Sequence, residues 1–224
     1  MPHVRLPAEW EPQQAVWLAW PRDPLTWPDR VEKARAVFVQ AMEAIAPQTV
    51  HLIVHPDLAA DAAKQTAHLD NVQLHEVEHQ DSWVRDYGPL YVETPEGLLA
   101  KKFTFDAWGE KYESLMADNE VFQKLAPLAP KEDVHFVLEG GAVETDGTGL
   151  FLATKSVAKG RGQSLADHEQ MLRDELGATK VIWLESGIEG DDTDGHIDTI
   201  ARFTAPGCVV ATRPPAGHPD HFAL

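Results

Sequence analysis

The feature of this sequence that most constrains its fold is a strand-strand-helix-strand pattern that occurs twice and begins a third time. Hydrophobic periodicity and the turn residues between the apolar runs predict these elements. The first copy is expected at residues 83–93, 98–105, 113–125 and 134–138, the second at 142–145, 150–154, 164–176 and 180–184, and the third at 196–203, 208–212 and a helix start at 219–224. Polar side chains open the copies at intervals of about 55 residues, a period typical of stacked or circularly arranged units. If the copies surround an axis, their openings meet at one central site.

The residues before the first copy predict strands and helices in alternation. Strands are expected at 14–20, 49–54 and 72–77, and helices at 31–45 and 56–69. The fold class is therefore α/β, and residues 1–224 are interpreted as a single incomplete domain. Because about three such units cannot close a ring, we expect a truncated chain with an unpaired, apolar edge, covered by self-association into a homo-oligomer or by a partner.

Composition limits the function classes. With 43% hydrophobic and 25% charged residues, the chain has the balance of a globular protein. No apolar stretch is long enough to cross a bilayer and no secretory signal pattern is found, so a cytoplasmic location is expected. The single cysteine, Cys208, excludes an internal disulfide framework and a cysteine-based zinc cluster. A net charge of −17 argues against nucleic acid or an anionic membrane as partner and favours small cations.

The segment at residues 81–89 pairs an aromatic side chain with a carboxylate. Trp83 lies three residues before Asp86. A carboxylate accepts paired N–H bonds from a guanidinium and an indole face attracts its charge, so the two could hold a planar cation. Alternatively, Trp83 belongs to the core and Asp86 forms a structural ion pair with Arg85.

Glu139 ends an apolar run and is followed by Gly140 and Gly141. Two glycines let the backbone turn sharply and approach a ligand closely. The alternative is an ordinary turn at the end of a strand.

Residues 187–198 form a long acidic stretch that ends in His196 and Asp198. Two residues apart on an extended run, both side chains are expected on the same side, where the acid could orient the imidazole and tune it for proton transfer. A calcium loop is a rival interpretation, although the ligand spacing of an EF-hand is absent. A metal site made of His196 and Asp198 with Asp86 and Glu139 is the main chemical competitor.

Taken together, these carboxylates and the histidine suit a guanidinium substrate. The guanidinium carbon is deactivated by resonance, so an enzyme would hold the cation between carboxylates, attack it with a thiolate and hydrolyse the amidino-cysteine adduct. Every part except the thiolate is present.

The same residues carry a resemblance to a known family. Residues 7–13 (PAEWEPQ), 83–89 (WVRDYGP), 139–141 (EGG) and 191–198 (DDTDGHID) resemble, in order, the motifs of the agmatine deiminase and bacterial peptidylarginine deiminase branch of the guanidine-modifying pentein superfamily. The resemblance implies a pseudo-fivefold α/β propeller of ββαβ units, of which this chain supplies about three. Residues 159–162 (KGRG) depart from it, because the family has an Asn-Arg-Asn-like stretch there.

The resemblance also implies roles for single residues. Asp86 and Asp198 would grip the guanidinium, Glu139 and His196 would handle protons, and Trp83 would line the substrate channel. The family's nucleophilic cysteine lies in a Gly-rich His-Cys segment that nothing here matches. Cys208 is expected to be a buried structural thiol in its apolar strand, so this chain alone is expected to be inactive.

Three functional hypotheses follow. The first is hydrolysis of agmatine to N-carbamoylputrescine and ammonia by the full-length form, without metal or organic cofactor, with peptidyl-arginine as the alternative substrate. The second is a guanidinium- or polyamine-binding fragment without turnover. The third is a metal-dependent hydrolase that uses His196 and Asp198.

Overall fold

The computed structural model describes residues 4–126 and 128–218, so the helix start expected at 219–224 lies outside the described residues. Contacts between residues divide the chain into two compact units. The parallel-sheet unit contains residues 12–84 and 113–126. The hairpin unit contains the remaining described residues: 4–11, 85–112 and 128–218.

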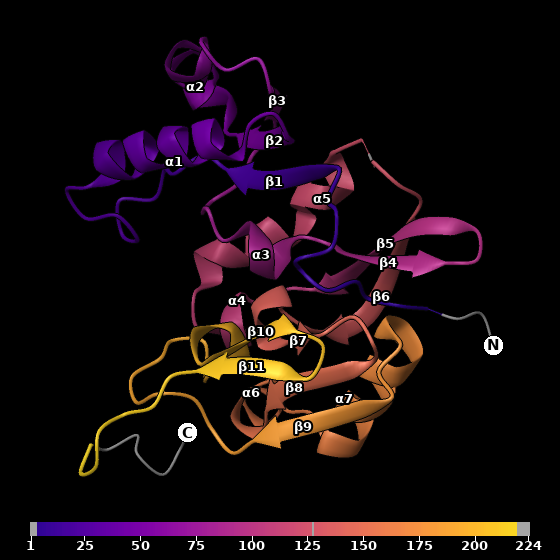
Figure 1. Ribbon diagram of the computed structural model, residues 1–224. Coiled ribbons are helices and arrows are strands. Elements are labelled where there is room, and N and C mark those ends of the chain that lie inside the picture. Colours follow the sequence, from indigo (N-terminus) through magenta and orange to yellow (C-terminus); the bar gives the residue numbers. More distant parts are fainter. Residues whose placement is uncertain (1–3, 127, 219–224) are drawn as a thin grey trace. The chain divides into compact units, whose positions relative to one another are not determined.

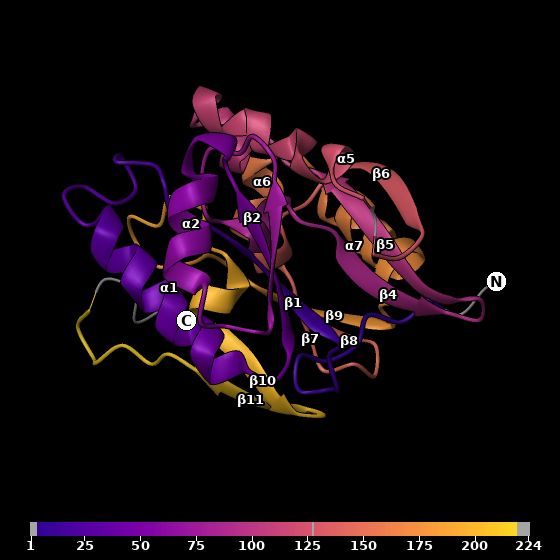
Figure 2. The same cartoon turned by 90° about the horizontal axis from the view of Figure 1, so that it is seen from above.

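The parallel-sheet unit confirms the predicted alternation of strands and helices (Figures 1 and 2). Its elements are β1 (Ala15–Ala19), α1 (Val31–Ile45), β2 (Thr49–Val54), η1 (Pro56–Leu58), α2 (Ala59–Thr66), β3 (Val72–Glu76), η2 (Glu113–Glu120) and α5 (Val121–Lys124). The three strands are parallel, in the order β1-β2-β3. Met42 of α1, Ala62 of α2 and Leu52 of β2 share one buried core. The 3.6-residue period of α1 therefore places its apolar stripe against the sheet.

The hairpin unit contains the repeated pattern with one exception: the helix expected at 113–125 is instead the 3-10 helix η2 followed by the short α5, and both belong to the parallel-sheet unit. Its first elements are α3 (Val84–Tyr87, which begins at the boundary between the units), β4 (Leu90–Thr94), β5 (Gly97–Thr104), α4 (Ala107–Glu110) and β6 (Lys131–Val137). They are followed by η3 (Gly140–Ala142), β7 (Glu144–Thr145), β8 (Leu150–Thr154), α6 (Lys155–Gly160), α7 (Leu165–Leu176), β9 (Lys180–Leu184), η4 (Ile197–Thr199), β10 (Ala201–Ala205) and β11 (Cys208–Ala211). In both three-stranded sheets, β4-β5-β6 and β7-β8-β9, an antiparallel pair is extended by a parallel strand. β10 and β11 pair in antiparallel fashion, as the first strands of each sheet do.

Neighbouring copies of the pattern share buried side chains. Phe103 of β5, Phe151 of β8 and Leu172 of α7 belong to one core. Leu152, on the other face of β8, packs with Ile197 and Phe203 of the third copy. Each copy thus covers an apolar face of the next, as expected for repeated units that cannot bury that face alone.

The ends of α7 follow from local sequence. Ser164 caps its N-terminus by accepting a hydrogen bond of 3.1 Å from the backbone N–H of Asp167. Gly177 ends it with a φ of 77°, in the left-handed region that favours glycine. Met171, Leu172 and Leu176 are buried, which confirms the predicted helix.

The openings of the three copies differ from the prediction. Residues 83–93, 142–145 and 196–203 were expected to be extended from their first residues, but each region has a short helical turn at or next to its start: α3, η3 and η4. At η4 the reason is local, because the hydroxyl of Thr199 donates to the backbone carbonyl of His196 at 2.8 Å. Threonine side chains that bond to nearby backbone compete in this way with strand pairing.

Candidate active site

The three helical turns bring the polar residues that open each copy to one place. Asp86 lies on α3, Glu139 directly precedes η3, and His196 directly precedes η4, which carries Asp198. All four belong to the hairpin unit.

Gly141 marks the point where the site residues meet. A Cβ atom added there would lie 2.5 Å from His196 Nδ1 and 2.8 Å from both Asp86 Oδ1 and Asp198 Oδ2. These distances are shorter than real Cβ contacts, so any residue other than glycine would have to displace these three side-chain groups. Gly141 therefore leaves the space in which these three side chains approach one another.

Asp86 is held by two hydrogen bonds. The backbone N–H of Gly141 donates to Oδ1 and the indole N–H of Trp108 donates to Oδ2, both at 3.0 Å. His196 Nδ1 lies 3.7 Å from Oδ1. Burial raises the pKa of Asp86, and the two donors act in the opposite direction. The carboxylate is therefore fixed in orientation and would be stabilised further by a cation.

Glu139 and His196 face each other with unused hydrogen-bonding capacity. Oε2 of Glu139 and Nε2 of His196 are 3.9 Å apart, and both atoms are buried. Within the described part of the chain neither atom has a hydrogen-bond partner. Burial raises the pKa of Glu139 and lowers the pKa of His196. Buried polar atoms without partners are costly, and an acid and a base with opposed shifts are typical of a proton-transfer site.

Asp198 completes the cluster from the other side of Gly141. Its side chain is partly buried, and burial raises its pKa while the neighbouring His196 acts to lower it. The predicted extended run through His196 and Asp198 was wrong, because His196 directly precedes η4 and Asp198 lies within it. The turn nevertheless places both side chains next to Gly141.

The electrostatics of the cluster favour a cationic ligand. Asp86, Glu139 and Asp198 surround one imidazole, and burial disfavours the charged form of all three carboxyl groups. A bound cation would offset that cost. A guanidinium also offers planar paired N–H donors, which match carboxylate oxygens.

Trp83 lies in the parallel-sheet unit, at its boundary with the hairpin unit. Its ring stacks on Trp27 with centroids 6.2 Å apart, and 44% of the residue is exposed. Trp83 is therefore not a core residue. The described residues show no ion pair between Arg85 and Asp86, and Arg85 instead pairs with Glu9 at 2.5 Å.

Two residues of the site were missed in the sequence. Trp108, which holds Asp86, lies in a left-handed run in which Ala107, Trp108 and Glu110 have φ values of 54°, 60° and 61°. Such values are rare outside glycine and often mark functional positions, but no simple sequence signal announces them. The other is Arg161, whose Nε donates to Glu139 Oε1 at 2.6 Å. It lies in the 159–162 stretch that had been noted only as a departure from the family pattern.

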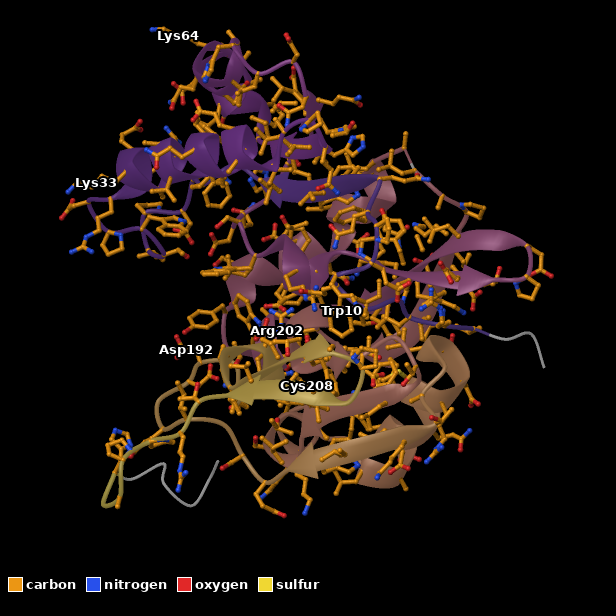
Figure 3. The ribbon with its side chains drawn as sticks, viewed as in Figure 1. Trp10, Lys33, Lys64, Asp192, Arg202 and Cys208 are labelled. Carbon is orange, nitrogen blue, oxygen red and sulfur yellow. The ribbon has the colours of Figure 1, made fainter. Side chains whose placement is uncertain are left out.

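Cys208 is exposed, so the prediction of a buried thiol was wrong. All four residues of β11 are exposed, and β10 is the strand with which it pairs in the described part of the chain (Figure 3). An apolar strand sequence indicates burial only when another layer covers it.

Residues 4–126 and 128–218 contain no group of three or more His, Cys, Asp or Glu side chains arranged to hold a metal ion. The same residues contain no helix that is long and apolar enough to cross a membrane.

Comparisons with known proteins agree on one family. The sequence profile of the Porphyromonas-type peptidyl-arginine deiminases matches residues 5–224. Agmatine deiminase of Stutzerimonas stutzeri (strain A1501) is 36% identical over 222 residues, which cover 92% of this chain and 59% of that protein. The chain thus spans about three fifths of the length of such curated relatives.

Solved structures give the same result. The structure described as agmatine deiminase of Enterococcus faecalis catalyzing its reaction has a TM-score of 0.87 at 31% identity, covering 99% of this chain and 64% of the other. A C. jejuni agmatine deiminase with substrate bound has a TM-score of 0.85 at 26% identity, covering 98% and 67%. The α/β architecture is confirmed by these similarities.

Proposed function

The chain belongs to the agmatine deiminase and Porphyromonas-type peptidyl-arginine deiminase family, and from its site we propose that the full-length protein hydrolyses a guanidino compound. The preferred substrate is agmatine, which with water would give N-carbamoylputrescine and ammonia. The observation that carries this proposal is the meeting of Asp86, Asp198 and His196 around Gly141, with Glu139 beside the imidazole.

Substrate binding is assigned to the two aspartates. Asp86 and Asp198 would accept N–H bonds from the guanidinium, and Asp86 is oriented for this by Gly141 and Trp108. The role of Trp83 in lining the substrate channel is proposed from the family resemblance alone. Removing a planar cation from water in this way requires paired carboxylates, which the cluster provides.

Proton transfers are assigned to Glu139 and His196. A thiolate would attack the guanidinium carbon, and His196 would protonate the departing nitrogen, which leaves as ammonia. Water would then attack the amidino-cysteine carbon, with Glu139 and His196 accepting its proton, and the ureido product would leave as the thiol is restored. This assignment is supported by Glu139 Oε2 and His196 Nε2, which lie 3.9 Å apart and have no hydrogen-bond partner within the part of the chain that the structure describes.

The nucleophile is assigned to a cysteine outside these 224 residues. The sequence contains one cysteine, Cys208, on the exposed strand β11 rather than among the turns that carry the site. The 224-residue chain is accordingly expected to bind substrate without turnover. We further propose a cytoplasmic enzyme whose domain is a propeller of about five ββαβ units, as the family resemblance implies, with assembly into a homo-oligomer.

The test is ammonia release by the full-length protein from agmatine, arginine and a peptidyl-arginine substrate in metal-free buffer. Turnover of agmatine that is lost in His196→Ala would support the proposal. Turnover of peptidyl-arginine alone would move the assignment to the alternative substrate of this family. No ammonia from any of the three would overturn it and leave a guanidinium-binding protein.

A further inference from the structure

The Arg161 guanidinium is buried next to the site and makes three directed contacts. Its Nε donates to Glu139 Oε1 at 2.6 Å and its Nη1 to Asp194 Oδ2 at 2.7 Å. Its Nη2 donates to the backbone carbonyl of Thr193 at 3.1 Å. Neither the Arg161 side chain nor the Glu139 side chain is exposed. The fork of donors therefore joins Glu139 to the segment that leads into His196.

The contacts determine which oxygen of Glu139 is available. Arg161 occupies Oε1, whereas Oε2 has no hydrogen-bond partner among the described residues and lies 3.9 Å from His196 Nε2. A buried carboxylate free to rotate could direct either oxygen at the imidazole. A charge-assisted bond to one oxygen in a fixed geometry removes that freedom.

The surroundings hold Arg161 and Asp194 tightly. A Cβ atom on Gly109 would lie 3.2 Å from Arg161 Nη1, and one on Gly160 would lie 2.6 Å from Asp194 Oδ2. Lys111 Nζ donates to Asp194 Oδ1 at 2.6 Å, so both oxygens of Asp194 are used. The two glycines thus leave just enough room for the ion pair, and neither partner can move away without breaking it.

Arg161 also counteracts the effect of burial on Glu139. Burial raises the pKa of Glu139, and the charge and hydrogen bond of Arg161 oppose that rise. Without the guanidinium, the buried Glu139 carboxyl would lose a hydrogen-bond donor and a close positive charge, and would keep its proton at higher pH.

We propose that Arg161 is a positioning residue for the deimination site: it holds Glu139 so that Oε2 faces His196, and it anchors residues 193–196, which present His196. The inference rests on the proposed function. The roles assigned to Glu139 and His196 require that Glu139 Oε2 and His196 Nε2 keep facing each other. Arg161 fixes the Glu139 carboxylate through its Nε, and its Nη2 holds the backbone of Thr193, three residues before His196.

The first test needs no substrate. In protein labelled with ¹³C on glutamate carboxyl carbons, the Glu139 titration is followed by NMR in wild type, Arg161→Met and Arg161→Lys. The control is Arg173→Met on α7, where the arginine is 40% exposed and pairs with Glu169. Arg161→Met is expected to raise the pKa of Glu139 by about 1–3 units, the usual effect of losing a close opposite charge. In Arg173→Met, Glu139 is expected to have the same pKa as in wild type.

The second test measures kcat, KM and the pH profile of the full-length enzyme. Arg161→Met is expected to lower kcat about 100-fold, the cost of displacing a catalytic group by about 1 Å, and to move the acid limb of the profile upward. Arg161→Lys, which keeps the charge but not the three-way fork, is expected to recover part of the rate and the position of the limb. If Arg161 only stabilised the fold, its substitution would lower the amount of active enzyme but would not move the acid limb of the pH profile.

Two results would overturn the inference. One is an Arg161→Met protein whose Glu139 titration matches wild type. The other is an Arg161→Lys protein with wild-type kcat and pH profile. If Arg161→Met does not fold, the lysine variant decides alone. If wild type releases no ammonia, the proposed function fails. The Glu139 titration then still tests whether Arg161 holds the Glu139 carboxylate.

Discussion

Gly141→Ala is the substitution whose effect follows most directly from the geometry. The added methyl group would lie 2.5 Å from His196 Nδ1 and 2.8 Å from two carboxylate oxygens, each well inside van der Waals contact. Asp86 cannot yield easily because Gly141 and Trp108 hold its two oxygens. Overpacking of this kind costs about 1–3 kcal/mol. The methyl group would also displace the carboxylates that are expected to receive the guanidinium, so agmatine binding is expected to weaken by about 1.5–3 kcal/mol for each charged hydrogen bond lost.

The assay combines urea unfolding with calorimetric titration of agmatine, and Gly97→Ala is the matched control. Gly97, the first residue of β5, has a φ of 120°, and apart from its chain neighbours no atom of the described residues lies within 4 Å of its added Cβ. Its substitution is expected to cost about 1–3 kcal/mol through backbone strain alone. Both variants should therefore lose stability, and only Gly141→Ala should lose agmatine. Equal agmatine affinity in the two variants would refute the reasoning.

Three further predictions concern single buried groups. Trp108→Phe removes the indole donor to Asp86 and is expected to weaken agmatine binding by about 1.5–3 kcal/mol, measured by calorimetry, with no loss if the bond is unimportant. Burial lowers the pKa of His168 to about 4, so stability is lost as pH falls from about 6.5 to 4, by about 3 kcal/mol at most. Urea unfolding should show that His168→Gln flattens this loss, and an unchanged slope would contradict it. Burial raises the pKa of Asp118 to about 7, so stability is lost as pH rises from about 4 through 7. Asp118→Asn should flatten that decline, a slope change opposite in sign to that of His168→Gln.

Much of the fold could be predicted because it rests on local patterns. Strands at 150–154 and 180–184 lie where their apolar runs indicated, and the helix expected at 164–176 is observed at Leu165–Leu176. The turns that carry the site could not be predicted in the same way. They depend on contacts distant in sequence, such as the bond from the Gly141 N–H to Asp86, 55 residues away.

The four polar residues of the candidate site could be identified from the sequence, but the residues that hold them in place could not. Asp86, Glu139, His196 and Asp198 stand next to glycines, turns or one another, and these patterns are visible in one sequence. Trp108 and Arg161 act through partners 22 residues away, with no periodicity to link them. The burial predicted for Cys208 from its apolar strand was wrong, because an apolar strand is buried only where another layer covers it and every residue of β11 is exposed.

The most direct test of the central claim is a crystal structure of the full-length protein with agmatine bound, using His196→Asn to slow turnover. The account predicts the guanidinium beside Gly141, with its nitrogens within hydrogen-bonding distance of the Asp86 and Asp198 carboxylates and its carbon near Glu139. Agmatine bound elsewhere, or bound with both aspartates uncontacted, would contradict it.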